Sequence, residues 1–364
     1  MSTNTSRKNV GTALVKAVCA VVFLFFTFVY LYHYQADILY VGQHVLSEGA
    51  TTYDPLVGAL LITLVLQVLQ MVVMGVMRVS HSAVALTWFP SFLILTVITD
   101  VGANIDSDFS FGGWAWAIPL LLIVWFFLTW GITKTENFDT RASANPLLSR
   151  QMWINVLTMV VMMLFTCTLS NDNDVFHYRM QAERYIRDGN YDAALDCGKH
   201  SVANDSSLTM LRAYALSNEG CLADSLFVYP VCGGSHVLMP DGTTTKSMTI
   251  PPHEIRKHYR QPKSAVDYRL MSLLLDKRID DFARCVRSYY KLDLSLPRHY
   301  REALVLYAHI RSNPVVVFYE SVMDADYRDM TDLMHSAHNA AERESLVRDA
   351  YGNTYWCYYF YGKK

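Results

Sequence analysis

Long apolar stretches alternate with short polar segments through the first half of the chain. The apolar stretches cover residues 10–32, 55–77, 83–99, 114–133 and 152–169. An α-helix needs roughly 17 to 25 such residues to cross the hydrocarbon core of a bilayer. The pattern therefore predicts a five-helix transmembrane domain at residues 10–169, preceded by a polar tail at residues 1–9.

The pattern changes after Leu169, where the run Ser170-Asn171-Asp172-Asn173-Asp174 ends the fifth stretch. Beyond this junction, apolar residues recur at spacings of three and four, which is typical of amphipathic helices. We expect a water-soluble helical domain at residues 170–350, which is long enough for a hydrophobic core of its own. The predicted fold class is therefore all-α.

Residues 230–262 interrupt the helical pattern. They contain Cys232-Gly233-Gly234, Pro240-Asp241-Gly242 and Pro251-Pro252, which are turn and loop sequences. An insertion of this length in a compact domain is more often functional than idle. Three arrangements fit the sequence: the insertion covers a groove of the helical domain, lies against the membrane helices, or is disordered.

The chain ends in an aromatic tail at residues 351–364. Between Tyr351 and Tyr361, seven of the eleven residues are aromatic. Such side chains are unfavourable when left in water. We favour a tail that caps the last helices of the domain. Contact with the bilayer interface, where Tyr and Trp are enriched, and a partner-binding role are the alternatives.

The positive charges predict how the chain crosses the membrane, because short cytoplasmic loops retain Lys and Arg. With the N-terminus in the cytoplasm, the inner segments contain seven such residues, and the outer loops 35–54 and 100–113 contain none. The seven are Arg7, Lys8, Lys16, Arg78, Lys134, Arg141 and Arg150. Five crossings then place the C-terminal domain outside. We expect a multi-pass protein of the inner (cytoplasmic) membrane with a periplasmic domain.

Overall charge and cysteine content narrow the class further. The formal net charge is −2, so nothing global indicates nucleic-acid binding. Of the 31 Lys and Arg residues, 7 precede Ser170 and 24 follow it, and the 33 acidic residues divide into 8 and 25, so both parts are near neutral. No CxxC pair indicates a zinc ribbon or a redox site. Disulfide pairing stays open among Cys197, Cys221, Cys232, Cys285 and Cys357.

Polar residues inside the spans are few. Gln67 and Gln70 lie in the second span and Asn155 in the fifth, and no charged residue occupies a span interior. Hydrogen bonds between helices account for these side chains without a transport pathway.

The first outer loop contains the one candidate reactive set near the membrane surface. Its residues are Asp37, His44, Glu48 and Asp54. The position is similar to the acidic outer loop of polytopic glycosyltransferases that take sugars from lipid carriers. An outer loop that obeys the charge rule explains these residues more simply.

Two further sets lie in the C-terminal domain. Arg256, Lys257, Arg260 and Lys263 form a basic patch that is a candidate for binding lipid phosphates or an acidic partner. His335, His338 and Glu342 have the spacing of one helix face, which makes them weak candidates for metal ligands. A solvated polar face explains them better, and we predict no metal and no cofactor.

One helix pair resembles a tetratricopeptide repeat, a family in which small residues let two antiparallel helices pack closely. The residues that carry the resemblance are Tyr178, Ala182, Tyr185, Gly189, Tyr191 and Ala194. A fainter copy surrounds Gly220, and helix pairs are predicted at 265–290 and at 300–310 with 315–322. The resemblance implies a tetratricopeptide-like α-solenoid, because such repeats are stable only when stacked.

Four short stretches carry a second resemblance, which covers most of the chain. They are Gln43-His44-Val45-Leu46-Ser47, Thr52-Tyr53-Asp54-Pro55, Phe89-Pro90-Ser91 and Thr354-Tyr355-Trp356. In these the chain resembles an uncharacterised family of Bacteroidetes inner-membrane proteins, in which several spans precede a helical repeat domain. That resemblance brings no known activity.

These observations favour an adaptor or scaffold over an enzyme. We expect a membrane-anchored helical repeat domain that binds a protein or peptide partner in the periplasm, with the lipid bilayer as the other contact. The alternative is a membrane enzyme that acts on lipid-linked or envelope sugars through the first outer loop. The sequence specifies neither the partner nor the oligomeric state.

Overall fold

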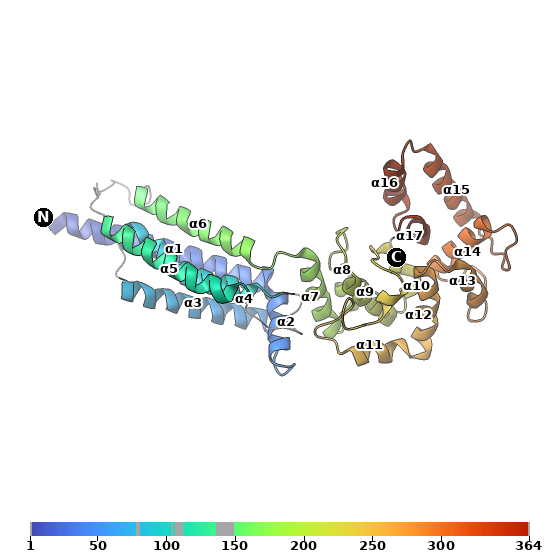
Figure 1. Ribbon diagram of the computed structural model, residues 1–364, viewed down its shortest axis with the longest axis horizontal. Helices are drawn as coiled ribbons and strands as arrows, with labels where there is room; N and C mark the ends of the chain where they lie inside the picture. Colours follow the sequence, from blue (N-terminus) through green and yellow to red (C-terminus); the bar gives the residue numbers. More distant parts are fainter. Residues whose placement is uncertain (1, 78–80, 103–104, 106–111, 136–148, 363–364) are drawn as a thin grey trace. The chain divides into compact units, whose positions relative to one another are not determined.

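The computed structural model describes residues 2–77, 81–102, 105, 112–135 and 149–362 (Figure 1). Within these residues every regular element is a helix, in agreement with the predicted all-α class. The chain divides into two compact units, residues 1–173 and 174–364. We call them the membrane unit and the C-terminal unit. The division falls close to the polar junction that the sequence predicts at Ser170.

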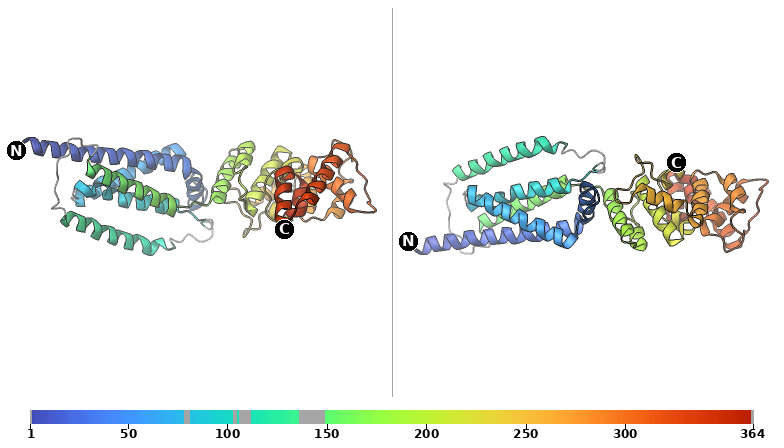
Figure 2. Two further views of the ribbon diagram at one scale, coloured as in Figure 1. Left: turned by 90° about the horizontal axis from the view of Figure 1, so that it is seen from above. Right: turned by 90° about the horizontal axis from the view of Figure 1, so that it is seen from below.

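Four helical segments of the described membrane unit are long and apolar enough to cross a bilayer. They are the end of α1 (Ser2–Val29) with the π-helical turn Tyr30–Tyr34, α3 (Pro55–Met77), α5 (Trp114–Thr135) and α6 (Arg150–Leu169). They run side by side in both views of Figure 2. Four of the five predicted spans are thereby confirmed as long apolar helices.

The remaining predicted span, residues 83–99 and third in chain order, is apolar but shorter, and it is not one continuous α-helix. It combines a 3₁₀-helix, η2 (His81–Trp88), with α4 (Phe89–Thr99). Pro90 contributes to this change, because it has no N–H to donate to the Leu86 carbonyl four residues earlier. The indole of Trp125 in α5 donates to that carbonyl instead, at 2.8 Å.

Polar side chains in the apolar helices join neighbouring helices, as the sequence predicts. Gln70 of α3 donates to the Thr87 hydroxyl of η2 at 2.9 Å. The side-chain oxygen of Asn155 in α6 accepts the Ala85 N–H of η2 at 2.7 Å. An unpaired backbone group costs several kcal/mol in hydrocarbon, so these contacts stabilise the irregular start of the segment.

The first outer loop is itself largely helical. α2 covers Ala36–Leu46 and ends in a tight turn at Glu48 and Gly49, which have φ angles of 52° and 83°. The Gln43 amide donates to the Thr51 hydroxyl at 3.0 Å, which ties the chain after the turn back to α2. The outer loop therefore presents a defined helical surface.

The C-terminal unit consists of short helices around one apolar core. In chain order they are α7 (Asp174–Arg187), α8 (Tyr191–Asp196), α9 (Ser206–Glu219), α10 (Leu222–Ser225), the 3₁₀-helices η4 (Leu226–Val228) and η5 (Ser235–Leu238), α11 (Pro252–Tyr259), α12 (Pro262–Leu275), α13 (Ile279–Val286), α14 (Arg298–Ile310), α15 (Ser321–Ser336), α16 (Ala340–Tyr351) and α17 (Tyr355–Tyr361). In Figure 1 their colours run from green at α7 to red at α17.

Helix pairs occur at three of the predicted positions. α7 packs against α8, α9 against α10, and α12 against α13. The second helices of these pairs have only six, four and eight residues, so they are shorter than the helices of a regular repeat would be. The fourth predicted pair is wrong in its second half. Residues 315–320 form no helix, and alternate side chains rather than one helical face are buried there.

The insertion at 230–262 folds onto α7 and α9 of the same unit. The Thr249 N–H donates to Glu183 of α7 at 2.8 Å, and Arg187 donates to the Thr249 carbonyl at 2.7 Å. The Lys246 N–H donates to the Ser207 hydroxyl of α9 at 3.0 Å. Of the three predicted arrangements, the structure therefore shows the insertion covering a surface of the helical domain.

The aromatic tail is a buried helix, α17, which packs against α14 and α16. Tyr355 and Trp356 are almost completely buried. The Trp356 indole donates to the Glu302 carbonyl of α14 at 2.7 Å, and the Tyr358 hydroxyl donates to the Leu275 carbonyl of α12 at 2.8 Å. These contacts confirm that the tail caps the last helices.

Candidate functional site

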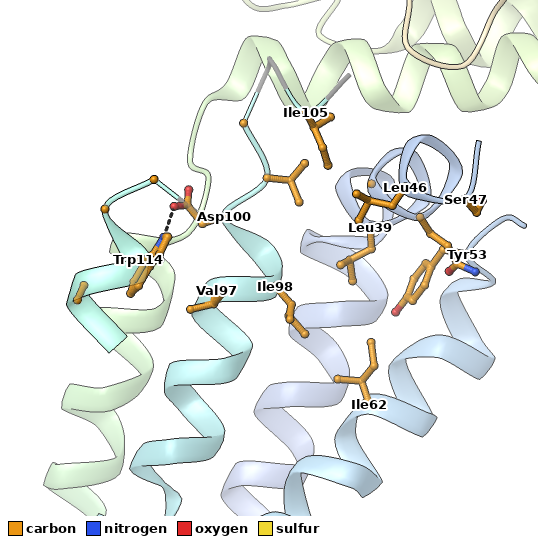
Figure 3. A pocket seen from close by; sticks show the side chains of 17 residues that line it. Leu39, Leu46, Ser47, Tyr53, Ile62, Val97, Ile98, Asp100, Ile105 and Trp114 are labelled. Atoms are coloured by element: carbon orange, nitrogen blue, oxygen red, sulfur yellow. Dashed lines mark hydrogen bonds between the residues drawn. The ribbon is translucent and has the colours of Figure 1, made fainter. Parts of the chain in front are cut away.

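A cavity of about 1070 Å³ opens at one end of the membrane unit (Figure 3). Residues of α2, α3, α4 and α5 and of their connections line it. The large apolar side chains among them are Leu39, Leu46, Ile62, Val97, Ile98, Val101 and Ile105. A cavity of this size, mostly apolar with a few polar groups, is typical of sites for small amphiphilic molecules.

Asp100 and Trp114 form one polar edge of the cavity. Asp100 directly follows α4 and Trp114 begins α5, and the indole Nε1 donates to the Asp100 Oδ2 at 2.6 Å (Figure 3). No other described residue donates to this carboxylate through its side chain or backbone. The sequence has no Lys or Arg at 35–54 or 100–113, so no basic side chain of these segments neutralises the charge.

Tyr53, just before α3, lies across the cavity from Asp100 in Figure 3. Its side chain is only 7% exposed, and its buried hydroxyl has no hydrogen-bond partner among the described residues. Burial, assisted by the charge of Asp54, raises the pKa of Tyr53 to about 12, so the hydroxyl keeps its proton at neutral pH. Leaving such a donor unpaired costs about 1–3 kcal/mol.

The position of the Tyr53 ring depends on Gly58 in the first turns of α3. A Cβ atom at Gly58 would lie 2.0 Å from a carbon of the ring, so a larger residue would displace Tyr53. Glycine is therefore required here for close approach, and it holds the unpaired hydroxyl on the cavity wall.

A second cavity of about 280 Å³ adjoins the first and is wholly apolar. It is lined by residues of α3, α4 and α5, namely Leu69, Pro90, Leu93, Ile94, Val97, Ile98, Ile118 and Leu122. Val97 and Ile98 line both cavities, and we call the two cavities together the cleft. Ile94 remains 43% exposed, which indicates that the cleft opens sideways from the helices.

The candidate reactive residues of the first outer loop lie outside this cleft. Asp37 is in the first turn of α2 and Glu48 lies beyond its last turn, so about 16 Å of helix separates them. Asp54 caps α3 by accepting the Val57 N–H at 2.8 Å. His44 lies on α2 between them, and none of the four lines either cavity.

The cleft was missed in the sequence because it depends on the spacing of helices that are far apart in the chain. Gln43, Ser47 and Tyr53 do belong to the stretches that carry the family resemblance, and all three line the larger cavity. Asp100 and Trp114 mark the ends of apolar stretches. Nothing in their sequence context indicates that they meet.

In the C-terminal unit, the repeat signature surrounds the turn between α7 and α8. Gly189 has a φ of 72°, which permits the reversal after α7, and Asn190 caps α8 by accepting the Ala193 N–H at 3.1 Å. Ala182 and Ala194 are buried where the two helices pack. The aromatic members of the signature, all half-buried, are Tyr178, Tyr185 and Tyr191.

Glu183 of α7 is a buried carboxyl that the sequence analysis did not single out. It accepts the N–H groups of Met248 and Thr249 at 3.0 and 2.8 Å and the Thr249 hydroxyl at 2.9 Å. Burial raises the pKa of Glu183, while these donors and the charge of Arg179 act in the opposite direction. The only signal in the sequence is an acidic residue beside the buried stripe of α7.

The predicted basic patch is exposed on α11 and at the start of α12. Its residues are Arg256, Lys257, Arg260 and Lys263. Arg256 also donates to the Pro240 carbonyl at 3.1 Å, so part of its role is to hold the insertion. Its binding to lipid phosphates or an acidic partner stays a prediction.

The weak metal candidates do not share one helix. His335 lies at the end of α15, whereas Glu342 lies in the first turn of α16 and accepts the His338 N–H at 2.9 Å. The proposed common face is wrong because Asn339 starts a new helix between them. Within the described residues no group of three His, Cys, Asp or Glu could hold a metal ion, and all seven cysteines are free thiols.

An exposed apolar row lies between α14 and α15. Val315, Val317 and Tyr319 are 62%, 75% and 72% exposed, whereas Val316 and Phe318 are 5% and 7% exposed and belong to the core. Such alternation is that of a β-strand. Among the described residues, no backbone N–H from 316 to 319 donates a hydrogen bond, and no carbonyl from 315 to 319 accepts one.

The comparisons with known proteins identify a family. No curated protein and no solved structure matches the chain. The sequence does match a family of unknown function, DUF6057, over residues 110–255 and 247–362. These overlapping segments extend from the start of α5 through α17, which agrees with the predicted resemblance to an uncharacterised family. Since the match covers more than half of the sequence, the chain belongs to the DUF6057 family.

Proposed function

We propose that the protein is an inner-membrane adaptor whose C-terminal unit lies in the periplasm and binds an extended segment of a partner protein. The orientation rests on the distribution of Lys and Arg, with seven residues in the inner segments and none in the outer ones. It also requires an odd number of crossings.

The apolar segment Ala83–Thr99 is long enough for the fifth crossing despite its 17 residues. Six residues of 3₁₀-helix rise about 12 Å and eleven of α-helix about 16 Å, since a 3₁₀-helix rises about 2.0 Å per residue. The sum of about 28 Å is close to the roughly 30 Å of hydrocarbon. This length supports five crossings and the periplasmic location.

The concave surface of a tetratricopeptide-like stack is not our candidate binding surface. The paired helices support a repeat-like arrangement, but the insertion covers part of α7 and α9. Thr245 and Thr249 of the insertion are buried there. A partner on this surface would have to break the hydrogen bonds between Glu183 and the insertion, which disfavours this surface as the binding site.

The observation that carries the proposal is the row of Val315, Val317 and Tyr319 with its unpaired backbone. Val316 and Phe318 anchor the segment in the core, and the Arg301–Glu320 ion pair at 2.9 Å fixes its end. The segment is thus held in place at three points before any partner arrives, which lowers the entropic cost of binding.

A rigid, extended and unpaired segment suits strand addition. In this mode a partner peptide aligns with the exposed backbone, whose N–H and C=O groups provide affinity, while alternate side chains provide specificity. Val317 and Tyr319 would contact β-branched or aromatic residues of the added strand, the cross-strand pairs that stabilise sheets. The expected partner therefore contributes an extended, alternately apolar segment.

Site-specific photocrosslinking in intact cells tests this proposal. A photoreactive phenylalanine replaces Val317 or Tyr319 in the full chain, with Val202 and Leu294 as control positions that are 87% and 69% exposed. We expect one discrete adduct with an envelope protein from 317 and 319, and none from the controls. Adding Val317→Lys to the 319 variant should reduce the adduct by about tenfold, because a charge would be buried against the added strand.

Several results would overturn the proposal. Equal adducts at all four positions, or none at any, would show that the row is not a binding surface. An adduct between two copies of the chain would replace partner binding by self-association. Capture of a cytoplasmic protein would reverse the orientation.

A further inference from the structure

We propose that the cleft in the membrane unit binds one phospholipid with an amine-bearing head group, of the phosphatidylethanolamine class. This is a binding function separate from the adaptor role. It rests on three properties of the described residues: the apolar channel along α4, the unpaired hydroxyl of Tyr53, and the acidic edge at Asp100.

The channel accounts for the acyl chain. The smaller cavity is lined only by apolar residues, and it shares Val97 and Ile98 with the larger one. Ile94 is exposed at its side, so a chain can enter from the surrounding bilayer without a rearrangement of the helices. In a membrane the molecule with the highest local concentration and the right shape is a lipid.

Tyr53 accounts for a hydrogen-bond acceptor on the ligand. Tyr53 lines the larger cavity, and its buried hydroxyl has no partner among the described residues. A buried donor of this kind is rare in folded proteins unless something satisfies it. The ester carbonyl or phosphate oxygen of a phospholipid would accept this hydrogen bond.

Asp100 accounts for the amine. Trp114 donates to one carboxylate oxygen, and no described residue donates to the other. The outer segments provide no Lys or Arg, so an anionic head group would find no basic side chain from them beside Asp100. An ethanolamine head supplies the missing positive charge beside Asp100 and the acceptor oxygens near Tyr53. Charge complementarity therefore favours it over phosphatidylglycerol.

The polar groups also distinguish a bound lipid from the ordinary lipid that surrounds any membrane helix. Ordinary contact is made by surface side chains such as Leu64 and Val124, which are 54% exposed and lie outside the cleft. The cleft adds a donor and an acceptor at fixed positions. A lipid bound in the cleft is therefore selected by its head group, whereas lipid on the outer surface of the helices is not.

Native mass spectrometry of the full chain tests the proposal. The protein is released from nanodiscs that contain equal amounts of phosphatidylethanolamine and phosphatidylglycerol with matched acyl chains. We expect one retained phosphatidylethanolamine per chain. Val97→Trp fills the junction of the two cavities and should abolish retention, whereas Val124→Trp on the outer surface of α5 should leave it unchanged.

Two nearly isosteric variants separate lipid binding from folding. Tyr53→Phe removes a hydroxyl that has no protein partner, so it should not lower the melting temperature in lipid-free detergent and should raise it slightly, while retention falls about threefold to tenfold. Asp100→Asn keeps an acceptor for Trp114 but removes the charge. It should reduce the preference for phosphatidylethanolamine about threefold to fivefold.

Other outcomes overturn the inference. Equal retention of both lipids by the unmodified protein would mean that the cleft holds bulk lipid without selection. Preferential retention of phosphatidylglycerol would contradict the role of Asp100. Unchanged retention in Tyr53→Phe and Val97→Trp would place the bound lipid elsewhere. Because crosslinking at 317 and 319 does not depend on these residues, failure here leaves the adaptor proposal intact.

Discussion

The membrane unit and the C-terminal unit each contain a segment that departs from regular α-helix, and they stabilise it with different chemistry. In the membrane unit, neutral side chains satisfy the backbone of η2: Asn155 accepts the Ala85 N–H and Trp125 donates to the Leu86 carbonyl. In the C-terminal unit, charged side chains do the same for the insertion, where Glu183 and Arg187 bind the backbone of Thr249.

The difference follows from the surroundings of each unit. A charge inside the hydrocarbon region costs free energy, so uncharged amide and indole groups are the favourable hydrogen-bond partners for an interrupted helix there. In the C-terminal unit a buried ionic group can pair with one at the surface, as Arg179 does with the partly exposed Asp205. Hydrogen bonds from or to charged groups are also stronger than neutral ones. Backbone groups outside regular helices are therefore bound by uncharged side chains in the membrane unit and by charged side chains in the C-terminal unit.

Among the substitutions that test this comparison, removal of the Glu183 side chain should reduce stability most. Glu183→Ala leaves two N–H groups and one hydroxyl of the insertion without a partner. We expect a loss of about 3 kcal/mol or more in the free energy of unfolding of the C-terminal unit. Hydrogen exchange followed by mass spectrometry on the full chain should show deprotection of residues 244–250.

Glu344→Ala is the control for that variant, because Glu344 is an exposed residue that pairs only with Arg348 on the same helix face. Its expected cost is below about 0.5 kcal/mol. Glu183→Gln should lie between the two, since it keeps one acceptor oxygen. If Glu183→Ala behaved like Glu344→Ala, the insertion would be held by its apolar contacts alone.

A smaller effect is expected in the membrane unit, where the backbone of the irregular segment is bound by an uncharged side chain. Asn155→Leu keeps the volume of the side chain but leaves the Ala85 N–H unpaired. The expected cost is about 1–2 kcal/mol, as for other hydrogen bonds between membrane helices. Far-UV circular dichroism of the full chain during titration with a denaturing detergent measures it. Thr158→Val is the control, because the Thr158 hydroxyl bonds only within its own exposed helix face. Equal shifts would contradict a special role for Asn155.

The sequence predicted the membrane unit better than the C-terminal unit, and the reason is physical. Apolar length alone decides where a membrane helix lies, so α3 covers the same residues 55–77 as its predicted span. In the C-terminal unit, distant polar contacts decide the outcome. The helix predicted at 315–322 rests on spacing alone, although Val, Phe and Tyr favour strands. Val316 and Phe318 are buried while their neighbours are exposed, and helix begins only at Ser321 of α15.

The candidate sites illustrate the same limit. The acids of the first outer loop are close in sequence, yet α2 separates Asp37 from Glu48 along its axis. Conversely, Tyr53, Asp100 and Trp114 come from three different segments and line one cavity. A pattern along the chain registers residues that are neighbours in sequence. It does not register a gap between helices, which depends on how far apart their axes lie.

The smallest predicted effect concerns pH, and it belongs to the C-terminal unit alone. His258 of α11 lies between the rings of Tyr214 and Tyr268, and its Nε2 lies 2.9 Å from the Ser217 hydroxyl. Burial lowers the pKa of His258 below its ordinary value. The unfolded chain, with a histidine pKa of about 6.5, then binds more protons than the folded chain just below that pH.

The contribution of His258 to the free energy of unfolding is consequently at its full value above about pH 6.5. It decreases as the pH falls from that value toward the lower pKa of His258 in the folded chain. The urea midpoint of the full chain in micelles, measured between about pH 7 and 5, should fall with pH, and His258→Gln should flatten part of the slope. His253→Gln, on the exposed side of α11, should leave the slope unchanged. An identical slope in both variants would show that His258 titrates alike in the folded and unfolded chains. The remaining pH dependence would then be assigned to the charged network around Glu183. The irregular segment of the membrane unit, residues 83–99, contains no Asp, Glu, Lys or Arg that could cause it.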